Sequence, residues 1–170
     1  MGRITFITAF FDIGRKQWSE GNFSRSNDKY LQYFEEWASV CGNDLIIYTD
    51  VEEFVDKIKE IRKNISARTE VIYIKDRHVL APEVFSAISS VNISRMQAYR
   101  LLPNNPEVVN YEYNYVMMLK HVLVLKAVDD FKLVGDIGWI DFGVSHVTGT
   151  DIELYESALE NERNKVTLFT

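Results

Sequence analysis

The sequence has little cysteine and a shortage of positive charge, and each shortage excludes a class of protein. Cys41 is the single cysteine, so the chain can form neither an internal disulfide nor a zinc site built from several thiolates. One cysteine is also typical of a reducing cytosol. The 25 acidic residues outnumber the 19 basic residues and give a net charge of -6, which argues against a general nucleic-acid-binding surface.

Long apolar runs are missing too. No stretch approaches the roughly 20 apolar residues that a membrane-spanning helix needs. The opening segment, MGRITFITAFFDIGR, lacks a secretory signal because its apolar run reaches Asp12 too early. We therefore expect a soluble, cytoplasmic protein, an expectation that leaves room for peripheral contact with the inner face of a membrane.

Common nucleotide-binding and hydrolase motifs are absent as well. The chain contains no GxGxxG, GxxxxGK[ST] or GxSxG, which excludes the dinucleotide, P-loop and α/β-hydrolase fingerprints. A DFG triplet does occur at residues 141–143. No HRD loop precedes it and the chain is too short, so a protein kinase is excluded.

What remains is a chain with the signals of a regular α/β domain. Its content of 46% hydrophobic and 13% aromatic residues allows a substantial core, and we expect one domain over residues 1–170. Short apolar runs predict strands at 4–11, 45–49 and 71–74, around WIDF (139–142) and at VTLF (166–169). Helices are predicted after the cap-like cluster 26–28, after Asp50, from Pro82 to about Ser90, and over 111–131, with a loop at 92–106.

This alternation predicts a three-layer α/β fold with a mainly parallel sheet and helices on both faces. The helix over 111–131 is apolar around most of its circumference, so we expect it to be buried on nearly every side. Asp12, Asp50 and Asp141 each fall just past or at the end of a predicted strand. Ligands of such sheets bind beyond the carboxyl ends of the strands, so these carboxylates should share one rim.

Two readings stay open for each acidic residue. Asp141 either caps the turn after its strand or meets a ligand or metal, with Gly143 leaving room for a close approach. Asp12 opens DIGR, either a simple turn or a loop in which Arg15 meets a phosphate or carboxylate. Asp50 is either a helix N-cap, with Glu53 completing a capping box, or a ligand of a ribose or base.

The basic residues of the later segments also allow two readings. Lys120 interrupts the apolar helix, so it either snorkels to the surface or reaches a partner or a ligand anion. His121 is more typical of a hydrogen-bonded core histidine than of a catalyst. Asn114 shares its helix face. His146 lies in the loop after the WIDF strand, where it is either a metal ligand or a base.

Four motifs occur in a characteristic order: TAFFDIGR (8–15), IIYTD (46–50), YNYVMMLK (113–120) and WIDFG (139–143). Together they resemble the HtrL/YibB-type bacterial proteins, which are associated with lipopolysaccharide-core and surface-polysaccharide gene clusters. That family is similar to the GT-A glycosyltransferases. The resemblance covers roughly residues 4 to 146 and implies a GT-A-like fold with a Rossmann-like nucleotide-binding half.

The resemblance implies an enzyme that transfers a sugar from a nucleotide-sugar to a glycan acceptor. The implied donor-binding residues are Thr8, Ala9, Phe10, Asp12, Arg15, Tyr48, Asp50, Asn114 and Gly143. Asp141 stands in the DxD position, where a divalent metal, Mn²⁺ or Mg²⁺, would bridge the diphosphate, with His146 as a further ligand. Lys120 would stabilise the leaving diphosphate.

The chain departs from the GT-A pattern in two ways. Gly143 replaces the second carboxylate of the DxD motif, and the chain ends soon after it, leaving the acceptor-binding half short or missing. We keep two alternatives: a non-catalytic interaction domain derived from this fold, and a metal-dependent phosphoesterase built from Asp12, Asp50 and Asp141. A shortened fold would also favour homo-oligomers, because an unfinished sheet or apolar patch invites association.

Overall fold

The computed structural model describes residues 4–18, 23–91, 95 and 97–146. Its strands are β1 (Thr5–Phe10), β2 (Asp44–Thr49), β3 (Thr69–Tyr73) and β4 (Ile137–Trp139). Its helices are α1 (Asn27–Ala38), α2 (Glu52–Ile61), α3 (Pro82–Ser89), α5 (Pro106–Val109) and α6 (Tyr111–Phe131), with 3-10 turns at Arg15–Gln17, Arg77–Leu80 and Val144–His146. The strand predicted at 166–169 lies outside the described residues.

All four strands run parallel, in the order β3-β2-β1-β4. β1 pairs with β2 from Thr5 opposite Asp44 to Phe10 opposite Thr49, and with β4 through its first three residues. The chain therefore builds the sheet outward from β1 to β3 and then returns to add β4 on the other side of β1. The strand order reverses between β1 and β4, and such a reversal is where open α/β sheets bind ligands.

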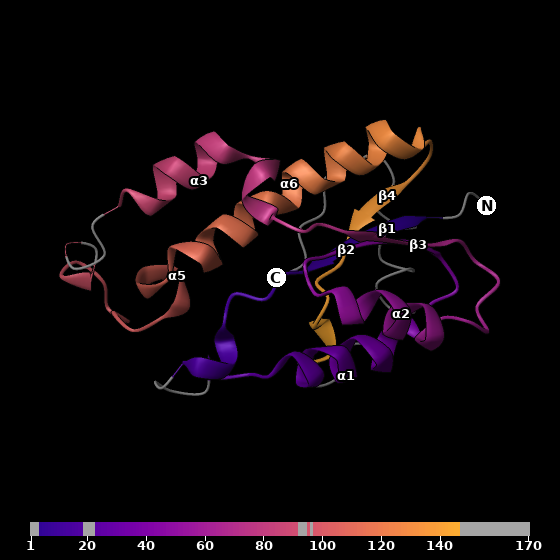
Figure 1. Cartoon of the computed structure of the whole chain (residues 1–170), viewed down its shortest axis with the longest axis horizontal. Helices are drawn as coiled ribbons and strands as arrows, with labels where there is room; N and C mark the ends of the chain where they lie inside the picture. Colours follow the sequence, from indigo (N-terminus) through magenta and orange to yellow (C-terminus); the bar gives the residue numbers. More distant parts are fainter. Residues whose placement is uncertain (1–3, 19–22, 92–94, 96, 147–170) are drawn as a thin grey trace.

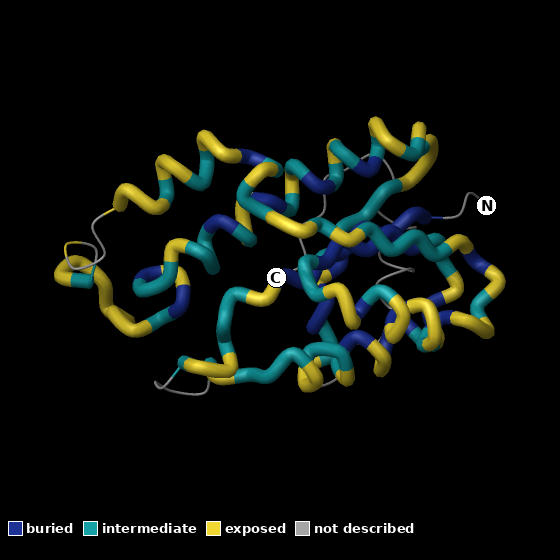
Figure 2. Tube along the Cα trace, viewed as in Figure 1, coloured by how far each residue is buried: buried dark blue, intermediate teal, exposed yellow. Residues whose placement is uncertain are grey.

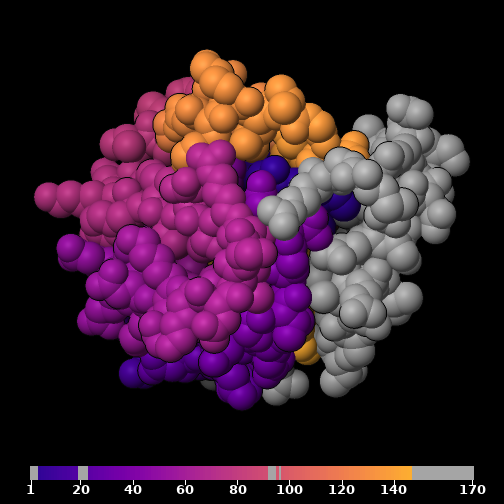
Figure 3. Space-filling model, turned by 90° about the vertical axis from the view of Figure 1, so that its right-hand side faces the viewer, coloured from indigo at the N-terminus to yellow at the C-terminus, as the bar shows by residue number. Residues whose placement is uncertain are grey.

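Helices cover both faces of the sheet (Figure 1). On one face α1 and α2 bury Phe34 and Phe54 against Phe10 of β1. On the other face α6 buries Tyr115 and Leu119 against β1 and β2, with α3 alongside. β1 and β2 form the most deeply buried stretch (Figure 2), and an end-on view shows α6 on one side of the molecule with α1 and α2 on the other (Figure 3). The predicted three-layer α/β arrangement with a parallel sheet is confirmed.

Local signals placed several helix starts correctly. Ser26 caps α1, since its Oγ accepts a hydrogen bond from the backbone N–H of Lys29 at 3.2 Å. Pro82 occupies the first turn of α3 as predicted. The capping box at Asp50 was wrong, because Val51 is the N-cap of α2 and no side chain caps that helix. Pro106, the last residue of the segment predicted as a loop, opens the short helix α5.

The long helix α6 is less buried than its composition predicts. Its buried residues form a single stripe at every fourth position, Tyr115, Leu119, Leu123 and Ala127. Met118 and Leu125, on the outer side, are 53% and 66% exposed. His121 is exposed as well, which corrects the expectation of a core histidine. Apolar composition alone did not distinguish a helix covering one sheet face from a helix surrounded by protein.

Tyr48 lies in the core beneath α6 and not at the rim formed by the carboxyl ends of the strands. Its ring is fully buried in the cluster around Ile7 and Tyr115. Within the described part of the chain its hydroxyl has no hydrogen-bond partner. Burial, with a contribution from Asp130, raises the pKa of Tyr48 to about 12. The buried hydroxyl therefore costs stability and contributes nothing to a ligand site.

We expect Tyr48→Phe to raise the free energy of unfolding by about 1 kcal/mol, because the substitution removes a buried polar group that no protein group satisfies. Urea unfolding of both proteins measures the change. Phe10→Ala, which opens a cavity in the opposite core, is the contrasting control and should lose about 3 kcal/mol. A loss of stability in Tyr48→Phe would show that the hydroxyl has a partner and contradict this description.

Candidate functional site

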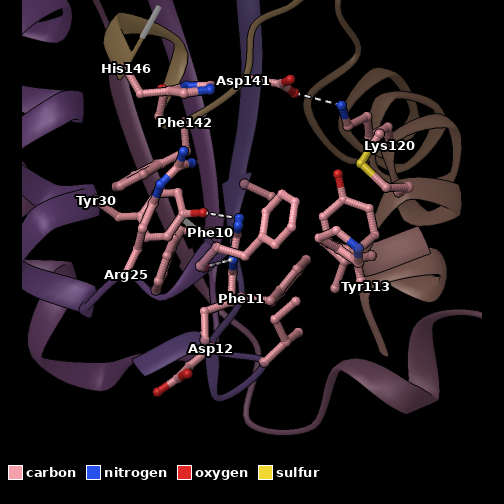
Figure 4. Close-up of a pocket in the computed structure, with 18 of the residues that line it drawn as sticks. Phe10, Phe11, Asp12, Arg25, Tyr30, Tyr113, Lys120, Asp141, Phe142 and His146 are labelled. Atoms are coloured by element: carbon pink, nitrogen blue, oxygen red, sulfur yellow. Dashed lines mark hydrogen bonds and ion pairs between the residues drawn. The ribbon is translucent and has the colours of Figure 1, made fainter. Parts of the chain in front are cut away.

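A pocket of about 330 Å³ opens where the strand order reverses, at the carboxyl ends of β1 and β4. One wall comes from the loop after β1 and from α1, and the other comes from α6 (Figure 4). The predicted site residues that line it are Ala9, Phe10, Asp12, Arg15, Lys120, Asp141, Gly143 and His146. Residues far apart in the sequence therefore meet at the edge that the strand pattern indicated.

Asp141 is fixed in the pocket by the apolar residues on either side of it. Ile140 and Phe142 are buried in the core, and Phe142 stacks on Phe34 with ring centroids 4.4 Å apart. The indole N–H of Trp37 donates to the carbonyl of Phe142 at 3.1 Å. The alternation of side chains along the strand thus continues beyond the end of β4, and it directs the Asp141 side chain outward, where it is 57% exposed.

Lys120 and Asp141 form an ion pair across the pocket. The ammonium nitrogen of Lys120 lies 2.6 Å from Oδ1 of Asp141 (Figure 4). The same oxygen accepts a hydrogen bond from the indole N–H of Trp139 at 2.7 Å. Lys120 also lies 5.7 Å from the centre of the Trp139 ring. Of the two readings of Lys120, the structure supports a partnered lysine, with its side chain only 22% exposed.

Gly143 has a different role from the predicted one. A Cβ at this position would lie 2.9 Å from Cδ1 and 3.0 Å from Cε1 of Tyr30, too close for real contacts. The close approach that glycine permits is therefore the packing of the Tyr30 ring, which in turn packs on Phe10 at 5.2 Å between centroids. Gly143 shapes the pocket wall through Tyr30.

We expect Gly143→Ala to destabilise the fold by about 2 kcal/mol, because the added methyl must displace the Tyr30 ring from a packed position. Gly42→Ala is a matched control, since a Cβ there meets nothing within 4 Å, and its effect should stay below about 0.5 kcal/mol. Thermal unfolding of the two variants makes the comparison. Equal stability of the two variants would contradict the contact between Gly143 and Tyr30.

The loop after β1 is built around Asp12. Its Oδ1 accepts from the backbone N–H of Gly14 and its Oδ2 accepts from the side-chain amide of Asn27, both at 2.8 Å. Gly14 has a φ of 73°, the left-handed conformation that glycine adopts without strain. Asp12 is thus a loop-forming residue at one end of the pocket, with Asp141 at the other end (Figure 4).

Arg15 is held in the pocket without a carboxylate. Its guanidinium donates to the carbonyl of Phe23 at 3.1 Å and to the hydroxyl of Tyr30. It also lies near the rings of Trp18 and Tyr113, 5.1 and 6.0 Å from their centres. Arg25, whose guanidinium lies 6.0 Å from the centre of the Tyr30 ring, lines the same wall. In the described part of the chain neither arginine forms an ion pair.

Asp50 belongs to a charged network behind the loop and does not line the pocket. Its Oδ1 accepts from the backbone N–H of Asp12 at 2.8 Å, and its Oδ2 pairs with Arg77 at 2.5 Å. Arg77 also donates to Glu112 at 2.8 Å and to the carbonyl of Asp12 at 3.2 Å. Burial raises the pKa of Asp50, although Arg77 and the Asp12 N–H act to lower it. The network therefore fixes the backbone of Asp12 through both its N–H, which Asp50 accepts, and its carbonyl, to which Arg77 donates.

Other predicted donor-binding residues lie outside the pocket as well. Thr8 is fully buried in β1, and the Tyr48 ring is buried in the core between the sheet and α6. Asn114 donates its side-chain amide to the carbonyl of Glu107 at 2.8 Å and so ties α5 to α6. The ends of the predicted strands gave the position of the rim correctly. They did not show which side chains of each strand point into the pocket.

Several pocket residues were missed by sequence reasoning: Phe23, Arg25, Asn27, Tyr30, Tyr113 and Trp139. One signal was available, because Tyr113, Met117 and Lys120 are spaced i, i+4 and i+7 and share one face of α6. Tyr30 packs on the core while its hydroxyl faces Arg15.

The described residues do not gather a cluster of metal ligands in the pocket. Nδ1 of His146 lies 2.7 Å from the carbonyl of Gly143 and donates to it, which leaves only Nε2 for other partners. Among the described residues no group of three or more His, Cys, Asp and Glu side chains is placed to hold a metal. Asp12, Asp50 and Asp141 therefore do not form the metal cluster that the phosphoesterase alternative requires.

Comparison with known proteins gives the family. A family model described as "Bacterial protein of unknown function (HtrL_YibB)" matches residues 2–170. The chain belongs to the HtrL/YibB family. It is 32% identical over 176 residues to Protein HtrL of Escherichia coli (strain K12), a match that covers 98% of this chain and 60% of that relative. The chain thus spans about three fifths of the length of this HtrL/YibB relative, and no solved structure matches it.

Proposed function

We propose that the chain is a GT-A-like glycosyltransferase, or the donor-binding part of one, that transfers a sugar from a nucleotide-sugar to a bacterial surface glycan. The observation that carries this proposal is the position of the pocket. It lies at the carboxyl ends of parallel strands, where the order β3-β2-β1-β4 reverses direction, which is the nucleotide-binding position of Rossmann-like sheets.

The lining of the pocket suits a nucleoside diphosphate. Phe10, Tyr30, Tyr113 and Trp139 present aromatic surface on which a base can stack. Arg15, Arg25 and Lys120 bring cations to the same cavity, and guanidinium groups match the oxygens of a phosphate in pairs. A volume of about 330 Å³ lies at the lower end of the range for small-molecule sites.

The proposed reaction requires charge stabilisation on one side and proton removal on the other. As the bond between the sugar and the diphosphate breaks, negative charge grows on the diphosphate, and Lys120 is placed to stabilise it. The acceptor hydroxyl must lose its proton. Nε2 of His146, the ring nitrogen not used by Gly143, is our candidate for that base.

The acceptor and the place of action belong to the proposal too. Within residues 4–18, 23–91, 95 and 97–146, no helix has the length and apolarity to cross a membrane. We propose cytoplasmic action at the inner face of the membrane on a growing glycan.

Thermal-shift titration with UDP, GDP, CMP and their sugars tests this function. One nucleotide class should raise Tm as its concentration passes the dissociation constant. Tyr113→Ala, which removes a pocket ring, should reduce the shift, whereas Tyr111→Ala on the same helix should not, because Tyr111 does not line the pocket. A folded chain that responds to none of these ligands would refute the proposal.

Activity is then measured as sugar released from the nucleotide that binds. Hydrolysis of the donor, or transfer to a glycan extract, supports the glycosyltransferase. Tight nucleotide binding with neither reaction would favour the non-catalytic interaction domain as the role of this chain.

A further inference from the structure

The proposed function raises the question of how the pocket neutralises a diphosphate, and the ligands in it do not suit a metal. Mn²⁺ and Mg²⁺ bind through several oxygen ligands gathered around one point. Oδ1 of Asp141 already receives two donors, the Lys120 ammonium at 2.6 Å and the Trp139 indole N–H at 2.7 Å. A cation at this carboxylate would stand close to an ammonium group of the same sign.

The other oxygen ligands lie elsewhere. Both carboxylate oxygens of Asp12 accept hydrogen bonds that hold the loop, from Gly14 and Asn27. Asp12 and Asp141 lie at opposite ends of the pocket (Figure 4). His146 uses Nδ1 on the carbonyl of Gly143. Glu107 also lines the pocket, and its Oε1 accepts a hydrogen bond from the side-chain amide of Asn105 at 3.0 Å. Among the described residues, each carboxylate of the pocket therefore already receives a hydrogen bond or an ion pair.

Cations, in contrast, are gathered in the pocket. Arg15 and Arg25 line one wall, and among the described residues no carboxylate pairs with either of them. Arg15 is oriented by the carbonyl of Phe23 and the hydroxyl of Tyr30, contacts that position its planar group and leave its charge unneutralised. Lys120 faces them from α6. Three positive side chains therefore surround a space in which a diphosphate, with one negative charge on each phosphate, would be neutralised.

We propose that this site binds the diphosphate of its nucleotide directly through Lys120, Arg15 and Arg25, without a divalent cation, and that Asp141 serves to hold Lys120. The inference rests on the proposed function, because it assigns the chemistry of the same pocket. In the free protein Asp141 keeps the half-buried ammonium of Lys120 paired and pointed into the cavity. An ammonium has three donors, so a bound phosphate can share Lys120 with Asp141.

The two ways of holding a diphosphate predict opposite results for one substitution. Asp141→Asn keeps an oxygen acceptor for Trp139 and removes the negative charge. If Asp141 binds a metal, this change abolishes diphosphate binding. If Asp141 only holds Lys120, the ammonium is freed from its competing charge, and affinity for the diphosphate stays within about threefold or increases.

Calorimetric titration of the full chain with UDP, GDP and inorganic pyrophosphate, in EDTA and in Mn²⁺, tests the inference. We expect the same affinity in both buffers. Lys120→Met should weaken diphosphate binding about 10- to 100-fold, and Lys120→Arg should retain most of it. Lys126→Met is the matched control, because Lys126 lies on the same helix, pairs with Asp130 and does not line the pocket, so its affinity should not change.

Three outcomes separate the two proposals. Binding in EDTA that is lost in Lys120→Met and kept in Asp141→Asn supports the metal-free site. Binding that needs Mn²⁺ and is lost in Asp141→Asn overturns it while the proposed function stands. If the folded chain binds no nucleotide in either buffer, the proposed function fails and this inference fails with it.

Discussion

Arg62→Met is expected to lower the free energy of unfolding by about 4 kcal/mol, a large loss for a residue remote from the pocket. Arg62 is only 2% exposed, and burial lowers the pKa of its guanidinium. The group donates to the carbonyls of Ala38, Cys41 and Asn43 at 2.7, 3.1 and 2.9 Å, and to the hydroxyl of Thr69 at 2.9 Å. Methionine fills similar space but leaves these acceptors unsatisfied.

The effect should extend over two layers of the fold. Arg62 follows α2 and joins it to the end of α1 and to the starts of β2 and β3. Arg68→Met is the control, since Arg68 is 41% exposed, forms an exposed ion pair with Glu70 and lies 4.8 Å from the centre of the Phe131 ring, so its loss should stay below about 1 kcal/mol. Urea unfolding followed by circular dichroism gives both values. A loss for Arg62→Met as small as that for Arg68→Met would contradict the structural role.

Arg77→Met is expected to cost about 3 to 5 kcal/mol and also to weaken nucleotide binding. Arg77 is 15% exposed and joins Asp50 and Glu112, which are 10% and 18% exposed. Its removal leaves two half-buried carboxylates without their shared cation and frees the carbonyl of Asp12. Because the network holds the loop that carries Arg15, we expect the pocket wall to loosen as well.

The loss should depend on pH, and its sign follows from Asp50. Burial already raises the pKa of Asp50 in the native state. The contribution of Asp50 to the free energy of unfolding therefore falls as the pH rises above the ordinary pKa of an aspartate. Arg77 limits that fall, and without it the pKa of Asp50 rises further. The deficit of Arg77→Met should therefore be smallest near about pH 4 and largest at about pH 7.

Denaturant unfolding at several pH values measures this profile, with Lys75→Met, an exposed change in the same segment, as the control. A deficit that is independent of pH would show that Asp50 does not depend on Arg77.

The sequence predicted the parts of this fold that local signals specify. Apolar runs placed β1, β2 and β3, whereas β4 ends at Trp139, where the predicted WIDF strand begins. Ser26 and Pro82 placed helix starts, and the carboxyl ends of the strands indicated the rim where the pocket lies. Each of these features depends on residues within a few positions of one another.

Features that depend on distant partners were not predictable in the same way. Asp50 looked like an N-cap because its partners, Arg77 and the backbone of Asp12, come together only in the folded chain. Gly143 was predicted to leave room for a ligand, and nothing in the sequence shows that the Tyr30 ring packs against it. Lys120, expected to meet a ligand, meets Asp141, so a pair of residues each predicted to be functional neutralise one another in the free protein.

The central claim is that a nucleotide-sugar occupies the pocket at the carboxyl ends of β1 and β4. Hydrogen–deuterium exchange of the full chain, with and without the nucleotide that stabilises it, tests this position most directly. The account predicts slower exchange in residues 12–18 and 23–30 and in 139–146, with no change in α2 or α3. Protection confined to α2, α3 or the outer side of α6, with none in the pocket segments, would contradict it.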